Sequence, residues 1–288
     1  MSLVTSDQEL GRARLSFRGI VVSEWIKFFS VRSSYLVLGL FILVTAGFNT
    51  VLCLGLRLRG DPQNLAEQHL SVMVAQLTAV VGTLVVGVLG VLAITTEYSS
   101  GQIRTSLWAV PRRLPVLWAK AVVVAFVAAW AAVVTIILSY LVGWLLLRHS
   151  GIDLSLTARQ NARILVGIIL FVVTITVLGL MVGALIRSTA GALAAVVTLT
   201  FVLPVIANLV RGALGVAPTY SLVRRLVFYS LEILPTAAGQ PLLSWTTSDT
   251  SSRVPTLHLT AWTGLAVMWA WVVVVAVPAI IRLRTRDA

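Results

Sequence analysis

The chain has 288 residues, of which 58% are hydrophobic and 11% are charged, and its mean hydropathy is +0.98. Soluble domains are about half apolar and about a quarter charged, so this composition excludes a soluble globular protein of this length. The net charge is +12, and because the basic residues gather at the ends of apolar runs, we expect them to meet lipid headgroups rather than nucleic acid.

An amphipathic helix is predicted ahead of the first apolar run. Phe17, Ile20, Trp25 and Phe28 recur at helical spacing, which favours a helix lying in the inner membrane interface. Glu24 falls on this apolar face, where a carboxylate is costly. Either Glu24 reaches the headgroups or it meets a cation from another cytosolic element. Because the segment is mixed in charge and precedes a run of spanning length, we expect no cleavable secretory signal.

Six charge-free apolar runs follow, and each is close to the roughly 20 residues that a helix needs to cross a hydrocarbon core. They extend from Tyr35 to Leu56, from Leu70 to Thr96, between Lys120 and Arg148, between Arg163 and Arg187, from Ser188 to about Val210, and from Leu259 to Ile281. We therefore predict an all-α membrane protein with six transmembrane helices. Cys53 is the one cysteine, so the chain has no internal disulfide and no cysteine metal cluster.

The loop between the second and third spans, from Glu97 to Lys120, is the most informative part of the sequence. Gly101 interrupts the preceding helix, Gln102–Ala109 can form about two helical turns, and Pro111 ends them. A short rigid helix tethered to two spans could receive force from a soluble motor. A solvated hairpin that anchors the two spans explains the same residues equally well.

The later part of the chain carries three structural signals. Gly179 and Gly183 form a G-x-x-x-G pattern, which predicts a close helix contact within a subunit or between two. Pro204 is expected to kink the fifth span. In the outer connection, Ser221–Leu234 could form a helix that dips into the outer leaflet and ends at Pro235.

The distribution of basic residues predicts the orientation. With the N-terminus in the cytosol, 13 of the 22 Lys and Arg residues lie on the cytosolic side, so both termini are expected there. The chain then forms one transmembrane domain, with a cytosolic tail and the amphipathic helix at 1–34, spans one to five at 35–210, the outer connection at 211–258, the sixth span at 259–281, and a cytosolic tail at 282–288.

The sequence lacks the motifs of an ATPase and of common membrane enzymes. Neither Lys27 nor Lys120 lies in a G-x-x-x-x-G-K-[ST] run, so the chain cannot hydrolyse ATP alone. H-E-x-x-H and G-x-S-x-G are absent, and no carboxylate falls within a predicted span, which also argues against a proton-coupled carrier. His69, His149 and His258 stand at predicted outer edges with unrelated spacing, so interfacial anchoring is favoured over a metal site.

Two stretches resemble the permease subunits of ABC-2 type export transporters, in particular the short bacterial subunits that are encoded apart from their ATPase. They are SEWIKFFSVRSSY at 23–35 and EYSSGQIRTSLWAVPRRLPVLWAK at 97–120, and together they cover about an eighth of the chain. A weaker similarity is ILPTAAG at 233–239, before the final span.

The resemblance implies a dimer of six-span subunits, either a homodimer or a heterodimer with a related permease. Each subunit would dock a separate ABC ATPase, which binds ATP and Mg²⁺, while this chain binds no cofactor. Ser23–Arg32 would be the connecting helix, with Glu24, Trp25, Lys27 and Arg32. Gln102–Ala109 would be the coupling helix, and the positions expected to contact or support the ATPase are Glu97, Tyr98, Gly101, Gln102, Ile103, Arg104, Thr105, Leu107, Arg112 and Arg113.

The function implied is export of an apolar or amphipathic substrate, such as a drug, an antibiotic, a peptide or a lipid, across the bacterial cytoplasmic membrane. The spans hold few polar groups, and the candidate substrate contacts are Phe41, Phe48, Asn49, Gln76 and Asn208. Two alternatives remain: a membrane scaffold or sensor without transport, and a membrane enzyme with an unrecognised site. We further hypothesise that Glu24 pairs with Arg104 or Arg112 and so links the connecting helix to the coupling loop.

Overall fold

The computed structural model describes residues 16–59, 74–75, 78–99, 113–148, 159–215, 222–244 and 259–285, and these residues form helices and turns without a strand. The prediction of an all-α fold is confirmed for them. The α-helices are α2 (Phe17–Ser30), α3 (Arg32–Arg59), α6 (Thr83–Ser99), α8 (Arg113–Leu147), α9 (Arg159–Ile186), α10 (Thr189–Val197), α11 (Leu203–Gly215), α12 (Leu222–Glu232), α13 (Pro235–Ala238) and α14 (Ala261–Thr285). Two π-helical turns, η1 (Thr78–Gly82) and η2 (Thr198–Val202), and one 3₁₀ turn, η3 (Gln240–Leu242), join them.

Five of these helices are long and apolar enough to cross a membrane. They are α3, α8, α9, α14 and the continuous helix made by α10, η2 and α11, and each coincides with a predicted run. The second predicted run is represented by α6, which has 17 residues and follows η1. Most of 70–77, where that run begins, lies outside the described residues, so the second span, and with it the total of six, stays a prediction.

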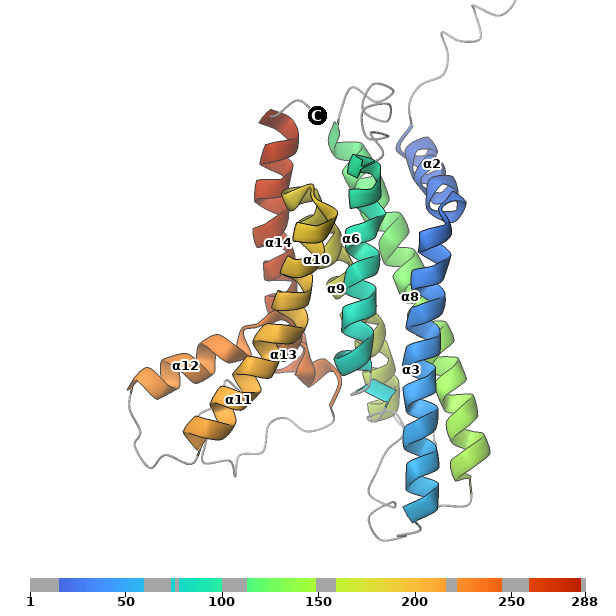
Figure 1. Cartoon of the computed structure of the whole chain (residues 1–288), viewed down its shortest axis with the longest axis vertical. Coiled ribbons are helices and arrows are strands. Elements are labelled where there is room, and N and C mark those ends of the chain that lie inside the picture. The colour runs from blue at the N-terminus through green and yellow to red at the C-terminus, as the bar shows by residue number, and fades with distance from the viewer. Residues whose placement is uncertain are drawn as a thin grey trace, which may run out of the picture.

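The third helical span begins earlier than the sequence indicated. We expected it to open at Lys120, but α8 starts at Arg113 and so contains Lys120 two turns inside the helix. Pro115 is compatible with this start because the first turn of a helix needs no backbone donor within the helix. The start of α8, the end of α6, helix α2 and the end of α14 lie toward one end of the bundle (Figure 1).

Helix α9 is the centre of the bundle, and its packing against α6 depends on glycines. In its most apolar stretch 72% of the residues are buried, against 17% for the α10–η2–α11 helix. A Cβ on Gly179 would collide with the carbonyl oxygen of Gly87, and one on Gly183 would lie 2.7 Å from Cγ2 of Ile94. A Cβ on Gly90 would likewise collide with the α9 backbone. The predicted close contact is therefore confirmed, and it joins two helices of one subunit.

The fifth span changes its winding at the predicted position. The π-helical turn η2 ends at Val202, and Pro204 is the second residue of α11. Because proline donates no backbone hydrogen bond, the turn before it loses its regular pairing. Figure 1 shows α11 leaning away from the bundle beyond α10.

The connection before the last span contains the predicted helix, realised as α12. Whether α12 enters the outer leaflet stays a prediction. The helix was expected to end at Pro235, but α12 ends earlier, at Glu232, and Pro235 opens the short helix α13. The indole Nε1 of Trp271 in α14 donates to the carbonyl oxygen of Ile233 at 2.8 Å, which fixes the turn between α12 and α13 to the bundle.

Candidate functional site

Helix α2 packs on α8 through the face that carries Glu24. The hydroxyl of Ser16 caps the helix by accepting a hydrogen bond from the amide of Gly19 at 3.2 Å. Ile20, Glu24 and Phe28 are the buried residues of α2, and their spacing of four residues places them on one face. The prediction that Glu24 lies among apolar residues is confirmed.

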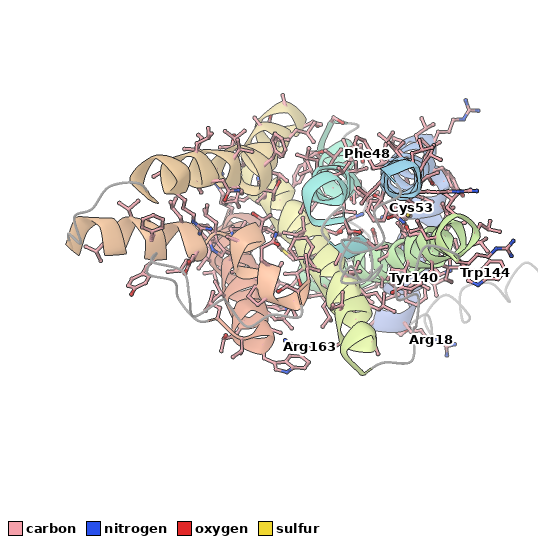
Figure 2. All side chains as sticks on the ribbon, turned by 90° about the horizontal axis from the view of Figure 1, so that it is seen from below. Arg18, Phe48, Cys53, Tyr140, Trp144 and Arg163 are labelled. Atoms are coloured by element: carbon pink, nitrogen blue, oxygen red, sulfur yellow. The ribbon has the colours of Figure 1, made fainter. Side chains whose placement is uncertain are left out.

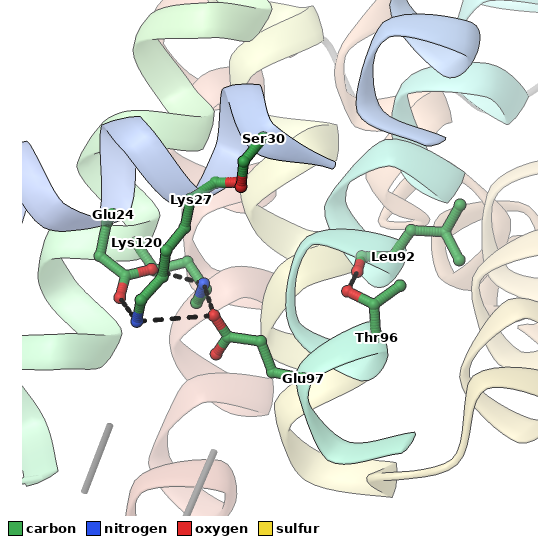
Figure 3. A network of polar contacts seen from close by, with 7 residues as sticks. All are labelled: Glu24, Lys27, Ser30, Leu92, Thr96, Glu97 and Lys120. Carbon is green, nitrogen blue, oxygen red and sulfur yellow. Dashed lines mark hydrogen bonds and ion pairs between the residues drawn. The ribbon is translucent and has the colours of Figure 1, made fainter. Parts of the chain in front are cut away.

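Four charged side chains from three helices meet beneath α2, and we call Glu24, Lys27, Glu97 and Lys120 the charge cluster (Figure 3). Nζ of Lys120 lies 2.5 Å from Oε2 of Glu24 and 2.9 Å from Oε1 of Glu97. Nζ of Lys27 lies 2.7 Å from Oε1 of Glu24 and 3.9 Å from Oε1 of Glu97. Each lysine therefore bridges both carboxylates.

The charge cluster is shielded from solvent. Glu24, Glu97 and Lys120 are 3%, 6% and 7% exposed, whereas the side chain of Lys27 is 27% exposed. Burial acts to raise the pKa of Glu24, but Lys120 and Lys27 outweigh it, so the pKa of Glu24 lies below its ordinary value. The two carboxylates and two ammonium groups cancel in charge, which is the condition under which buried ions are tolerated.

The charge cluster lies close to both ends of the segment 100–112, which contains the predicted coupling helix. Glu97 lies two residues before the end of α6 at Ser99, and Lys120 lies seven residues after α8 begins at Arg113. The segment 100–112 connects these two ends and lies outside the described residues. The ion pairs therefore tie α2 to both helices that bound this segment.

The expected partner of Glu24 is identified in part. Glu24 was expected either to reach the lipid headgroups or to meet a cation from another element. It meets a cation, and that cation is Lys120 of α8. Arg104 and Arg112 lie outside the described residues, so their pairing with Glu24 stays a prediction.

Of the other expected coupling positions, Tyr98 is described and packs beside Arg187, whose guanidinium carbon lies 5.6 Å from the centre of its ring. Arg113 opens α8, but its side chain is outside the described set. The remaining expected positions also lie outside the described residues: Gly101, Gln102, Ile103, Thr105 and Leu107.

At the same end of the bundle as the charge cluster, hydrogen bonds join the end of α9 to the end of α14. Arg187, in the turn between α9 and α10, has a φ of 59°, a left-handed conformation that non-glycine residues rarely adopt. Its Nη2 donates to the carbonyl oxygen of Arg282 at 2.9 Å, and Nη1 of Arg282 donates to that of Leu185 at 2.8 Å. These reciprocal bonds hold the ends of α9 and α14 together.

In the expected connecting helix, Trp25 contacts α8. Its ring centre lies 5.6 Å from that of Phe126, and it is 38% exposed. Arg32 is the first residue of α3 and is exposed. Sequence reasoning identified Glu24, Lys27 and Glu97 as site residues but treated Lys120 as a span boundary.

The expected substrate contacts do not form one site. Phe41 is buried against η1, where a Cβ on Gly82 would lie 3.0 Å from its ring. Asn49 is buried and donates through Nδ2 to the carbonyl oxygen of Ser139 at 3.3 Å. Phe48, which is labelled in Figure 2, lies on α3 and is 54% exposed. Asn208 is exposed on α11, and Gln76 lies outside the described residues.

The three histidines considered as metal ligands, His69, His149 and His258, all lie outside the described residues. Within the described ranges no three His, Cys, Asp or Glu side chains gather closely enough to hold a metal ion.

A family model described as ABC-2 family transporter protein matches residues 20–288, which includes α2 from Ile20 onward, the charge cluster and every candidate span. No curated protein matches the chain.

Proposed function

The chain belongs to the ABC-2 family of transporter proteins, and on that basis we propose that it is the permease subunit of an exporter driven by a separate ABC ATPase. It is a multi-pass membrane protein. In this proposal the subunit spans the bacterial cytoplasmic membrane six times, with both termini in the cytosol. ATP and Mg²⁺ bind to the partner, and an apolar or amphipathic substrate crosses a dimer of permease subunits.

The charge cluster is the observation that carries this proposal. An ATPase that grips 100–112 pulls on the ends of α6 and α8 at Ser99 and Arg113. Because Lys120 bridges Glu24 and Glu97, displacement of either helix end also displaces α2. The nucleotide drives transport to the extent that the ATPase binds one arrangement of these helices more tightly than the other.

The lining of the spans supports an apolar or amphipathic substrate. Several buried hydroxyls in the described helices are paired with their own helix: those of Thr78, Thr95, Thr135 and Thr176 each donate to the carbonyl oxygen four residues earlier. Groups occupied in this way offer little to a hydrophilic cargo.

The ATPase partnership is tested by co-purification. The tagged full-length chain is expressed with a candidate bacterial ABC ATPase, and the ATPase retained on the tag is measured. Arg104→Glu, in the expected coupling helix, should lose the ATPase. Arg148→Glu, an exposed charge reversal that follows α8 at its other end, should retain it. Retention by the Arg104 variant, or equal loss by both, contradicts the docking site.

Transport itself separates the exporter from a scaffold or sensor. The complex is placed in sealed vesicles, and movement of a fluorescent amphipathic dye is followed after ATP addition. The exporter accumulates dye only with hydrolysable ATP. A complex that binds and stimulates its ATPase, yet moves neither this dye nor a panel of lipids and peptides, supports the scaffold or sensor instead.

A further inference from the structure

A cavity of about 260 Å³ lies beside the charge cluster, between α2, α3, α6 and α8. One part of its wall is polar, formed by the charge cluster together with Ser30, Ser33 and Ser34. Another part is aliphatic and includes Leu89, Ala93 and Val123. A wall divided in this way suits a ligand that is itself polar at one end and apolar at the other.

The mouth of the cavity lies at the junction of α2 and α3. Ser30 and Val31 form this junction and are the exposed residues of the wall, whereas the aliphatic residues are buried or half-buried. Tyr35 and Leu36, one turn into α3, are 52% and 72% exposed. Since α3 is a candidate span, its first turn lies near the level of the lipid headgroups. The cavity is therefore open where headgroup meets acyl chain.

We propose that this cavity binds one phospholipid whose headgroup carries both a phosphate and a primary ammonium, that is, a phosphatidylethanolamine. The phosphate lies at the partly exposed ammonium of Lys27 and the hydroxyls of Ser33 and Ser34. The ethanolamine ammonium donates to the carboxylate of Glu97, and the glycerol and first methylenes cover the aliphatic wall.

The charges of the site select this headgroup. The charge cluster sums to zero, so an anionic lipid would add an uncompensated negative charge beside two buried carboxylates. A zwitterion adds no net charge and can contact both signs. A choline headgroup is also zwitterionic, but its quaternary ammonium has no N–H to donate, and it is bulkier than ethanolamine. The inference depends on the membrane location of the chain and not on its ATPase.

The test is native mass spectrometry of the full-length chain in detergent micelles. The chain is mixed with equimolar phosphatidylethanolamine, phosphatidylcholine and phosphatidylglycerol that share the same acyl chains. We expect one bound lipid per subunit, with phosphatidylethanolamine favoured about tenfold, the effect of one hydrogen bond between charged groups. Equal retention of phosphatidylglycerol overturns the proposal.

Variants locate the binding site. Ala93→Phe fills the aliphatic end and should abolish retention, while Val122→Phe adds the same side chain to a 50% exposed position of α8 and should not. Ser33→Ala combined with Ser34→Ala leaves the charge cluster unchanged and should weaken binding about fivefold or more, so the proposal can be tested even if Ala93→Phe does not fold. Unchanged binding in the double serine variant overturns the proposal. If free phosphoethanolamine at matched concentration displaced the bound phosphatidylethanolamine, the ligand would be a soluble molecule and the lipid proposal would be overturned.

Discussion

Replacing Lys120 with methionine should release α2 from the bundle, because this ammonium is shared by two buried carboxylates. Without it, Glu97 keeps Lys27 at 3.9 Å as its remaining partner in the charge cluster. Removing one member of a buried ion pair typically costs about 3–5 kcal/mol. Protonation of one carboxylate is the least costly way to remove the uncompensated negative charge in this variant. For an ordinary glutamate pKa of about 4.3, that protonation costs about 4 kcal/mol at pH 7 and about 1 kcal/mol at pH 5.

The loss of stability in Lys120→Met should therefore shrink from about 4 to about 1 kcal/mol between pH 7 and pH 5. In the wild type, Glu24 stays ionised across this range because Lys120 and Lys27 hold its pKa below the ordinary value. Lys27→Met is the matched control, and because that side chain is 27% exposed its loss should stay near or below about 1 kcal/mol.

The assay is unfolding in mixed micelles with increasing sodium dodecyl sulfate, followed by tryptophan fluorescence at both pH values. The reasoning is refuted if Lys120→Met is no less stable than Lys27→Met at pH 7. A loss of stability in Lys120→Met of the same size at both pH values would also refute the reasoning, because protonation of a carboxylate would then not be what limits the loss.

Three further predictions concern the described residues. Since the pKa of Glu24 is below its ordinary value, its contribution to stability is complete above the ordinary glutamate pKa and is lost on further acidification; Glu24→Gln should show a smaller acid-induced fall in melting temperature. Gly179→Ala forces a methyl group against the carbonyl of Gly87 and should cost about 1–3 kcal/mol in the micelle assay, whereas Gly55→Ala, with no atom within 4 Å of its Cβ, should cost nothing. Asn49→Leu loses one long hydrogen bond and removes a buried oxygen without a partner, so it should cost less than about 1 kcal/mol; a transport defect in this stable variant would assign Asn49 a substrate role.

Helix positions could be predicted because a bilayer imposes a length that charge-free runs reveal directly. The same reasoning misplaced the start of α8, since it takes each charged residue as a boundary. Lys120 lies inside the helix because Glu24 and Glu97 neutralise its charge. A boundary based on charge fails wherever a buried partner compensates it.

The need for the charge cluster was predictable, but its membership was not. Glu24 on an apolar helix face required a cation, and the sequence indicated this requirement. Which cation satisfies it depends on how α2, α6 and α8 meet, and no local spacing encodes that packing. For the same reason the G-x-x-x-G pair predicted a close contact without showing that Gly87 and Gly90 of α6 form its other side.

The packing of α9 suggests how motion at one end of the proposed exporter reaches the other. Near the charge cluster, Gly183 holds α9 against α6 without room to slide, so a displacement of α6 carries α9 with it. Toward its N-terminal end, α9 meets the segment formed by α13 and η3: a Cβ on Gly167 would collide with the carbonyl oxygen of Leu242, and the ring of Phe171 lies against Gly239. Close-packed contacts of this kind shift as units rather than deform. In the proposed exporter, a pull on 100–112 would therefore move the α13–η3 segment through α9, without requiring any change inside that helix.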